Sequence, residues 1–518
     1  MRFSVHAEEV AGLGTTLHTD LCAVILFEGE VGGSGDGGGS AALAALDGAL
    51  GGILKRAAEE EQFTGKKGQS LSLHTHGKIG AGRVLLLGVG KAKDFQAPDV
   101  RHWMARVAKA AAQSRSKSVA VVPPRIAGTN PELAERLGQL FVEGVLLSTY
   151  QFDRYLAGER KKPTPIEAVT LAVSGSGLDA AAVQRGLTRG EVVARWVMVA
   201  RDLTNEGASE LPPRKLAERA SQIASERGME IEVLGPRECT ELGMGLYLSV
   251  ARGSDEEPRF IHLTYKPRDA APRRRIALVG KSVTFDAGGL SLKTNEGMLD
   301  MKMDMGGGAA VLGAIGALAE LGCPDEVHAI LPACENMPSG RAYKLGDLMR
   351  SMAGKTVELN NADAEGRLTL ADAITFALQK IKPDELLDFA TLTGASMVAL
   401  GPYTASVLSN RGELAGRFLQ AAQQAGEDMW QLPLNDRLFD MLKSDFADMK
   451  NTGERYGGTI TASLFLREFV GDTPWLHVDL AGPVHATKEW GHHVKGATGF
   501  GVASIVEYLV PRGAESKA

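Results

Sequence analysis

Cysteine is scarce in this 518-residue sequence, which holds only Cys22, Cys239, Cys323 and Cys334. The four are scattered, and none belongs to a C-x-x-C pair. A disulfide framework or a zinc site built from thiolates is therefore not expected. Any metal site in this chain must use other side chains.

Long hydrophobic runs are also missing. No apolar stretch approaches the roughly 20 residues that a membrane-spanning helix needs. The N-terminus, MRFSVHAEEV, lacks the basic start and apolar core of a secretory signal. These features predict a cytoplasmic protein with no membrane partner.

The sequence has no large excess of one charge. Its net charge is -6, and 23% of its residues are charged. A weakly acidic total gives no support for a dedicated nucleic-acid binder, although a local basic face stays open. Nucleic acid is therefore not expected as the main partner.

The first third of the chain alternates strand-like and helix-like segments. Apolar runs at 21–29, 83–91 and 118–124 predict strands, and helical periodicity covers 100–113. The glycine-rich stretch 31–40 predicts a loop, and it lacks the Gly-Lys-Ser/Thr ending of a phosphate-binding loop. The alternation predicts an α/β domain with a largely parallel sheet.

A helix-like segment at 187–205 leads into a second α/β pattern. We place the domain boundary beside it, giving a smaller N-terminal α/β domain, 1–185, and a larger C-terminal one, 186–518. In the larger domain, strands are predicted at 229–235, 259–265, 274–280, 326–333 and 385–394, and helices at 307–321 and 368–381. The fold class is α/β, and the larger domain is expected to hold a central mixed sheet flanked by helices.

Acidic and basic side chains gather in glycine-rich segments of the larger domain, near predicted strand ends. Open α/β sheets bind ligands in such places. The set consists of Lys281, Asp286, Lys293, Asp304, Asp363, Glu365 and Arg367. These residues are the candidates for a functional site.

Spacing within NADAEGRL adds two expectations. Asp363 and Glu365 are two apart, so both carboxylates would point to one side of an extended segment. Arg367 follows a glycine at the start of a predicted helix. A guanidinium beside free N–H groups of a helix start suits a small anion.

Carboxylates gathered without histidine or cysteine favour hard or borderline divalent metals such as Mg, Mn or Zn. Two metals roughly 3.5–4 Å apart would neutralise the repelling acids, polarise a substrate and activate a water molecule. Nearby dications depress the pKa of a lysine, so its neutral amine can join such a site. The alternative is that each acid is a solvated loop residue, and spacing alone leaves this open.

Six segments resemble the successive motifs of the leucyl aminopeptidase (cytosol aminopeptidase) family. They are VGKSVTFDAGGLSLK, MKMDMGGGAAV, ENMPSGRAYKLGD, NNADAEGRLTLADA, DFATLTGA and GTITASLFLREFV. The resemblance runs from about Asp202 to Phe500, with the motifs in the family's order. NADAEGRL departs at Ala362, where the family usually has threonine, but that position lies between ligands and supplies no metal contact of its own. The N-terminal part shares only a loose pattern with the family's smaller α/β domain.

The resemblance implies two divalent metal ions per subunit, Mn or Zn. Asp286 and Glu365 would contact both of them. Lys281 and Asp304 would complete the tightly held metal, and Asp363 the exchangeable one.

Two further residues would act on the substrate. The resemblance implies that Lys293 polarises the scissile carbonyl and that Arg367 holds a bicarbonate ion, which helps take a proton from the bridging water. Asp300 lies four residues before Asp304, but the MKMDM context matches the family at Asp304. Asp300 is therefore not expected to be a ligand.

The resemblance also suggests residues that bind the substrate, for most of which core packing is the alternative. They are Met301, Asn361, Thr391, Leu392, Ala481 and Val484.

The function implied is a metallo-aminopeptidase that releases N-terminal residues, preferably apolar ones such as Leu or Met, from peptide substrates. A metal-bridging hydroxide would attack the first peptide carbonyl, and the protein would be a homohexamer. One rival is a two-metal phosphoesterase, which would need more cationic groups than Lys293 and Arg367. A second is a DNA-binding role, which some bacterial members of the family also have. A third is a peptide binder without activity, which the presence of all seven site residues disfavours.

Overall fold

A computed structural model of the chain describes residues 1–7, 18–32, 40–161, 164–268 and 271–510. The chain forms two compact units, Met1–Ala194 with Glu489–Val494, and Arg195–Lys488 with Lys495–Ala518. The division falls within helix α6 (Ala180–Asn205), which also contains the boundary predicted at 185/186. Most of the glycine-rich stretch predicted as a loop, residues 33–39, lies outside the described residues.

The first unit is built on a six-stranded sheet of order β1-β6-β5-β2-β4-β3. Strand β3 pairs antiparallel with β4, and the other pairings are parallel. The strands are β1 (Arg2–His6), β2 (Thr19–Leu26), β3 (Ser70–His74), β4 (Ala81–Gly88), β5 (Ser118–Val122) and β6 (Ala168–Ala172). The predicted largely parallel sheet is confirmed.

Helices cover both faces of this sheet because its central strands are apolar on both sides. In β2, Leu21, Ala23 and Ile25 belong to one hydrophobic core, and Cys22 and Val24 to another. Helices α4 (Asp99–Gln113) and α5 (Pro131–Ser148) complete the first core. Helices α2 (Ala41–Ala49) and α3 (Ile53–Glu60) complete the second.

The second unit contains a nine-stranded mixed sheet of order β16-β15-β18-β14-β9-β11-β8-β7, with β10 paired to β11. The strands β9, β10, β11, β14 and β18 run parallel to one another. The bounds are β7 (Glu230–Leu234), β8 (Arg259–Tyr265), β9 (Arg275–Gly280), β10 (Ser282–Asp286), β11 (Glu326–Asn336), β14 (Glu385–Ala390), β15 (Ala405–Ser409), β16 (Met429–Gln431) and β18 (Trp475–Asp479). The predicted mixed sheet of the larger domain is confirmed.

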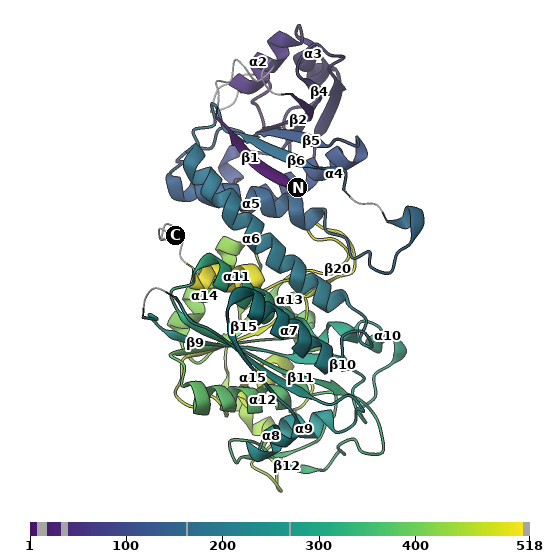
Figure 1. The fold of residues 1–518 in the computed structure, drawn as a ribbon, viewed down its shortest axis with the longest axis vertical. Helices are drawn as coiled ribbons and strands as arrows, with labels where there is room; N and C mark the ends of the chain where they lie inside the picture. Colours follow the sequence, from purple (N-terminus) through teal and green to yellow (C-terminus); the bar gives the residue numbers. More distant parts are fainter. Residues whose placement is uncertain (8–17, 33–39, 162–163, 269–270, 511–518) are drawn as a thin grey trace. The chain divides into compact units, whose positions relative to one another are not determined.

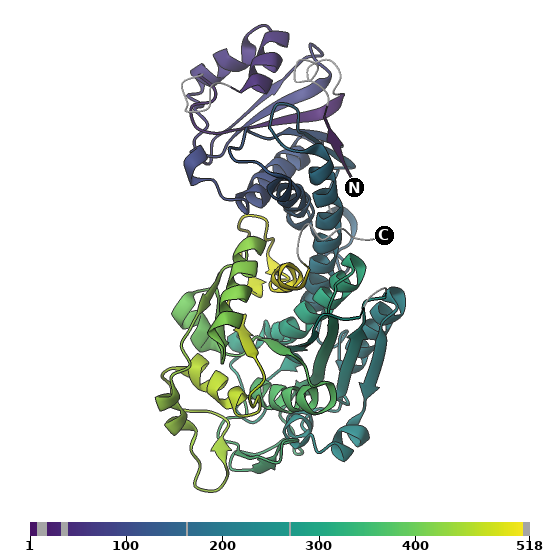
Figure 2. The ribbon, with the colours of Figure 1, turned by 90° about the vertical axis from the view of Figure 1, so that its left-hand side faces the viewer.

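Two groups of helices pack against this sheet (Figures 1 and 2). One group is α7 (Pro213–Arg227), α11 (Gly306–Leu321), α14 (Gly412–Ala425) and α16 (Val502–Leu509). The other is α9 (Gly245–Ala251), α12 (Gly366–Phe376) and α15 (Gly458–Arg467). Smaller elements include α8 (Pro236–Glu241), α10 (Asn295–Met298), the 3-10 helix η4 (Met301–Met305), α13 (Gly394–Leu400), and the short strands β12 (Leu348–Arg350), β13 (Thr356–Glu358), β17 (Met449–Lys450), β19 (His485–Ala486) and β20 (Gly496–Ala497).

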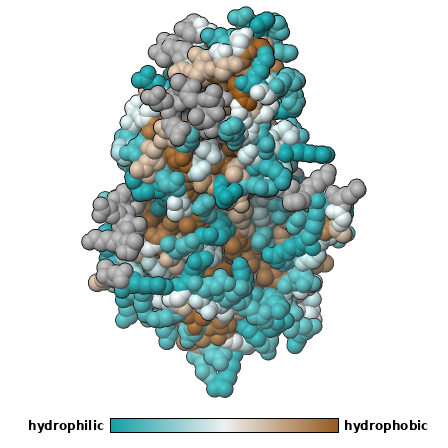
Figure 3. All heavy atoms as spheres, turned by 45° about the horizontal axis from the view of Figure 1, so that its top comes forward, coloured by the Kyte–Doolittle hydropathy of each residue, from teal (hydrophilic) through white to brown (hydrophobic). Residues whose placement is uncertain are grey.

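One helical stretch, Asn295–Leu321, is long and apolar enough by length and composition to cross a membrane. Inside the second unit, 83% of its most apolar window is buried. Core helices of globular domains pass the same test. Helix α11 is such a core helix, because it packs against β9, β11 and β14. Hydrophilic side chains cover most of the face seen in Figure 3.

Candidate functional site

The carboxyl ends of parallel strands bring the candidate residues together at one edge of the larger sheet. Lys281 follows β9, Asp286 ends β10 and Asn336 ends β11. Thr391 follows β14, and Asp479 ends β18. Parallel strands end at the same edge, so side chains far apart in sequence meet there.

Two other segments close over this edge. Helix η4 carries Asp304, and the residues before helix α12 carry Asp363 and Glu365. The expected extended conformation of this last segment is wrong, because residues 362–363 form a turn and Glu365 has helical angles of φ -74 and ψ -35. The turn still places both carboxylates in one cluster with Asp286.

A glycine allows the approach of the Asp286 loop to this turn. Gly288 has φ +86, and a Cβ there would lie 2.9 Å from Oδ1 of Asp363. A larger residue would be strained and would push Asp363 away.

Lys281 lies at the centre of the buried part of the site. Its Nζ is 2.7 Å from Oδ1 of Asp304 and 2.7 Å from Oε1 of Glu365. It also donates to the carbonyl oxygen of Thr391, at 3.1 Å. The hydroxyl of Thr391 donates to the same Asp304 oxygen, at 2.7 Å.

Lys293 joins the other two carboxylates. Its Nζ lies 2.9 Å from Oδ2 of Asp286 and forms a close ion pair with Asp363. The second oxygen of Asp286 accepts from the backbone N–H of Gly288 and the side-chain amide of Asn336, both at 2.8 Å. Asp286 is thus fixed in place, while Asp363 keeps 34% of its side chain exposed.

These residues fit divalent metal ions. Asp286, Asp363 and Glu365 each offer an oxygen within 4.8 Å of the others. Oδ2 of Asp304 and Oε2 of Glu365 are buried without a hydrogen-bond partner. Buried charged oxygens are costly unless they are paired or bind a metal. The expected donors are carboxylate oxygens and the amine of Lys281, which suit Mn or Zn better than a purely oxygen-binding ion such as Ca.

The pKa values show the electrostatic cost of burying these like charges together without cations. Burial raises the pKa of Asp304 well above its usual value, and Glu365 and Asp286 raise it further. Burial and Glu365 likewise raise the pKa of Asp286. Burial alone would lower the pKa of Lys281, but Asp304, Glu365 and Asp286 more than offset it, so the pKa is raised. Binding of dications would reverse these preferences and release protons.

Arg367 lies in the first turn of α12, which begins without a side-chain cap. One guanidinium nitrogen donates to the carbonyl of Asn451 at 2.9 Å, and its buried Nε has no hydrogen-bond partner. Burial lowers the pKa of Arg367 to about 10. The residue also lines a cavity of about 390 Å³, together with Asn361 and Asp363. An unpaired guanidinium N–H beside a cavity can hold a small anion.

The predicted substrate-binding residues take different places. Asn361 and Leu392 line the same 390 Å³ cavity. Thr391 contacts Asp304, as described above, and it lies close to Val484 around Gly306. Met301 is partly exposed, and Ala481 is buried at 9% exposure. Their role in substrate binding stays a prediction.

Sequence reasoning missed several residues that support the site. The side-chain amide of Asn336 donates to Oδ1 of Asp286 and to the carbonyl oxygen of Ala362. The hydroxyl of Tyr343 donates to the same carbonyl oxygen at 2.8 Å. Asp479 accepts from the hydroxyl of Thr393 at 2.6 Å and from the N–H of Leu392 at 3.1 Å. Asp479 could have been found, because it is an acid at the end of an apolar segment, as Asp286 is.

Comparison with known proteins gives a consistent result over both units. The sequence profile of the cytosol aminopeptidase family, catalytic domain, matches residues 198–506, and the profile of the family's N-terminal domain matches 24–159. A probable cytosol aminopeptidase of Microcystis aeruginosa is 43% identical over 495 residues, 95% of this chain and 96% of that protein. A probable cytosol aminopeptidase of Alkaliphilus metalliredigens is 40% identical over 508 residues, 98% of this chain and 99% of that protein.

Solved structures are similar as well. A mutant of tomato leucine aminopeptidase is 36% identical and superposes with a TM-score of 0.87, covering 98% of this chain and 96% of its own. The bottromycin maturation enzyme BotP in complex with Mn is 32% identical, with a TM-score of 0.80, covering 95% and 98% of the two chains.

Proposed function

This chain belongs to the cytosol aminopeptidase family and is a metal-dependent aminopeptidase, and on that premise we propose that it uses two divalent ions to release apolar N-terminal residues, such as Leu or Met, from peptides. The metals would be Mn or Zn. Lys281, Asp286, Asp304, Asp363 and Glu365 would hold them.

One observation carries this proposal. Four carboxylates and two lysines converge at one sheet edge, and two of the carboxylates keep a buried oxygen with no protein partner. A buried carboxylate oxygen without a partner is costly, and a bound metal ion would offset that cost.

The cations and the protein would share the chemistry. Two bound cations polarise a carbonyl group and lower the pKa of water, so that a strong nucleophile exists at neutral pH. Lys293 is the side chain placed to act on the substrate, because its ammonium lies between Asp286 and Asp363 with 16% of the side chain exposed. It would donate to the carbonyl oxygen of the first residue and stabilise the charge that develops there.

Arg367 would hold a bicarbonate ion that accepts a proton from the attacking water. Replacing Arg367 with Ala is expected to lower kcat on the order of 100-fold, the size of a typical general-base contribution. KM and the metal content should change little, because no hydrogen bond or ion pair joins Arg367 to a ligand carboxylate within the described residues; of these carboxylates, only Glu365 acts on it, through its longer-range charge. The measurement is kcat with and without added bicarbonate, with the melting temperature as a check on folding.

The matched control for this variant is Arg455→Ala, because Arg455 lines the same cavity. It should keep its rate and its response to bicarbonate. Equal losses in both variants would contradict a specific role for Arg367.

Specificity tests the substrate class. An apolar pocket formed by Met301, Ala481 and Val484 should make leucine and methionine amides better substrates than aspartate and glutamate amides. One methylene in such a pocket is worth only about 1–3 kcal/mol, so the preference among apolar residues should be broad. The measurement is kcat/KM over a panel of aminoacyl amides.

An N-acetylated leucine amide serves as the control in this panel. It should resist cleavage, because the free α-amine is needed for binding. A strong preference for acidic termini would refute the pocket, and rapid cleavage of the blocked amide would refute the aminopeptidase geometry.

Assembly, location and further partners extend the proposal. We expect a homohexamer, with six times the mass of the 54.9 kDa chain by light scattering. The relatives are named cytosol aminopeptidases, which supports a cytoplasmic location. A secondary DNA-binding role would show as a gel shift that weakens steeply with salt, and the net charge of -6 does not favour it.

A further inference from the structure

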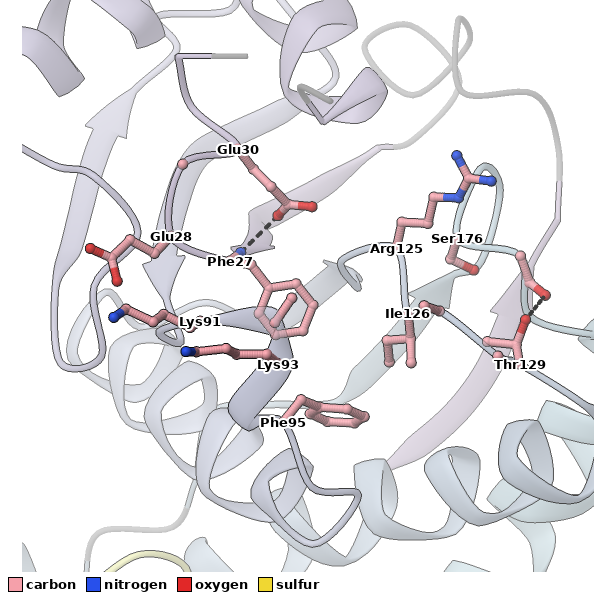
Figure 4. A pocket seen from close by; sticks show the side chains of 15 residues that line it. Phe27, Glu28, Glu30, Lys91, Lys93, Phe95, Arg125, Ile126, Thr129 and Ser176 are labelled. Atoms are coloured by element: carbon pink, nitrogen blue, oxygen red, sulfur yellow. Dashed lines mark hydrogen bonds between the residues drawn. The ribbon is translucent and has the colours of Figure 1, made fainter. Parts of the chain in front are cut away.

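The first unit has a large cavity that the peptidase chemistry does not use. Its volume is about 1170 Å³, and its lining comes from the segments that follow β2, β4, β5 and β6. All four strands run parallel, so the cavity lies at their carboxyl ends. It is shown in Figure 4.

The topology marks this place as a ligand site. The chain goes from β2 to β4 on one side, with the antiparallel β3 as the edge strand beyond, and then crosses to β5 on the other side of β2. The order of strands therefore reverses at β2. In open α/β sheets, small ligands bind in the crevice outside the carboxyl ends of the strands at such a reversal.

One side of the cavity is aromatic and offers a hydrogen-bond acceptor. The rings of Phe27 and Phe95 pack edge to face, with centroids 6.0 Å apart. Phe27 is buried in the core at 4% exposure, whereas Phe95 is partly exposed beside the open space in Figure 4. Beside them, Oε2 of Glu30 accepts from the backbone N–H of Phe27 at 2.7 Å. The other carboxylate oxygen of Glu30 has no donor within the described part of the chain. A flat ring that carries an amino group fits these features.

The opposite side carries one basic side chain and a loop of backbone N–H groups, while Lys91 and Lys93 lie on the side of Phe27. Arg125 lies across the gap from Phe27 in Figure 4, and it forms no ion pair with any described residue. The loop 125–129 leads directly into the 18-residue helix α5, and Ser176 and Gly177 come from the loop before α6. The start of α5 is already capped, because Asn130 accepts from the N–H of Leu133 and the first helical residue is Pro131. The backbone N–H groups of the loop 125–129 have no acceptor within the described residues, so together with Arg125 they can bind a phosphate group.

The charges of the lining agree with an anionic ligand. Lys91, Lys93 and Arg125 face only two acids in the lining, Glu28 and Glu30. The cavity therefore carries a net positive charge although the whole chain has a net charge of -6.

We propose that this cavity binds a nucleotide, with the base against Phe95 and the phosphate at Arg125 and the 125–129 loop. The free oxygen of Glu30 would accept from an exocyclic amino group, as adenine carries. The residues of this site belong to the first unit, whereas the proposed metal ligands belong to the second.

Calorimetric titration of the metal-loaded protein with ADP tests this. We expect one saturable site per chain. Adenosine and inorganic phosphate, each tested alone, should bind at least about tenfold more weakly, because each fills one half of the cavity. If either one bound as tightly as ADP, or if ADP did not saturate, the proposal would be overturned.

Variants separate this cavity from the metal centre, which could also attract phosphates. Arg125→Ala should raise the Kd for ADP by about tenfold through loss of a charge-assisted hydrogen bond. Phe95→Leu should weaken the binding of ADP more than the binding of phosphate. Lys117→Ala is the matched control, because Lys117 lies at the amino end of β5, in an exposed ion pair with Glu167. Unchanged binding in both cavity variants would assign the nucleotide to another site and overturn the proposal.

Discussion

Removal of divalent cations is expected to abolish hydrolysis of leucine amides, and Mn, Zn or Co is expected to restore it. The ligand set holds no thiolate, so ordinary chelators should empty at least the site completed by the partly exposed Asp363. Metal polarisation of the carbonyl and water is worth several kcal/mol. Since each 1.36 kcal/mol is a factor of ten, the loss should reach at least about 1,000-fold.

Three measurements accompany this test. Elemental analysis should give about two metals per chain before chelation, a number that rests on the two-metal chemistry proposed here. Circular dichroism should show that the stripped protein stays folded, because the core around β9 and β14 does not include the metal ligands. The melting temperature should rise on adding back Mn, because a ligand that binds only the folded state stabilises it. A fully stripped preparation that kept its original rate would contradict the assigned site.

The sequence predicted most of the sheet where strands are continuous apolar runs. Strands β8, β9 and β14 begin within a residue of the predicted positions, and β11 extends three residues further. Strand β18 (Trp475–Asp479) was not predicted, because His477 interrupts the apolar run that Asp479 ends. Both are fully buried, and Nδ1 of His477 lies 2.6 Å from Asp388. A buried polar network of this kind looks like a surface segment in the sequence.

That the candidate residues lie together was predictable from the sequence, but their geometry was less so. Acids and lysines that follow apolar strands indicate a site at the carboxyl ends of the strands. The structure brings the five proposed metal ligands together at such an edge. The turn at 362–363 was not predicted, because two-residue spacing is compatible with both an extended segment and a turn. Asn336 was missed, because a single asparagine at a strand end has no distinctive pattern, although its contacts fix Asp286.

Replacing Glu365 with Gln is expected to lower activity by at least about 100-fold and to drain the more weakly held metal. The change keeps the shape of the side chain but removes one buried negative charge beside Asp286 and Asp363. At an effective dielectric constant of about 20, a unit charge roughly 4 Å from another is worth about 4 kcal/mol. Half of that energy already corresponds to more than a factor of ten in rate or affinity. The removed charge would have attracted both dications, so the loss applies to each of them.

Asp300→Asn is the matched control for Glu365→Gln, because it makes the same chemical change on a neighbouring segment. Asp300 is partly exposed at the start of η4 and lies outside the cluster of Asp286, Asp363 and Glu365. Its variant should keep about two metals per chain and nearly full turnover, since the charge it removes is screened by solvent. Both variants should fold, because neither removes apolar core. If Asp300→Asn emptied the site while Glu365→Gln kept its metals and turnover, the ligand assignment would fall, and the roles given to Lys281, Asp304 and Asp363 with it.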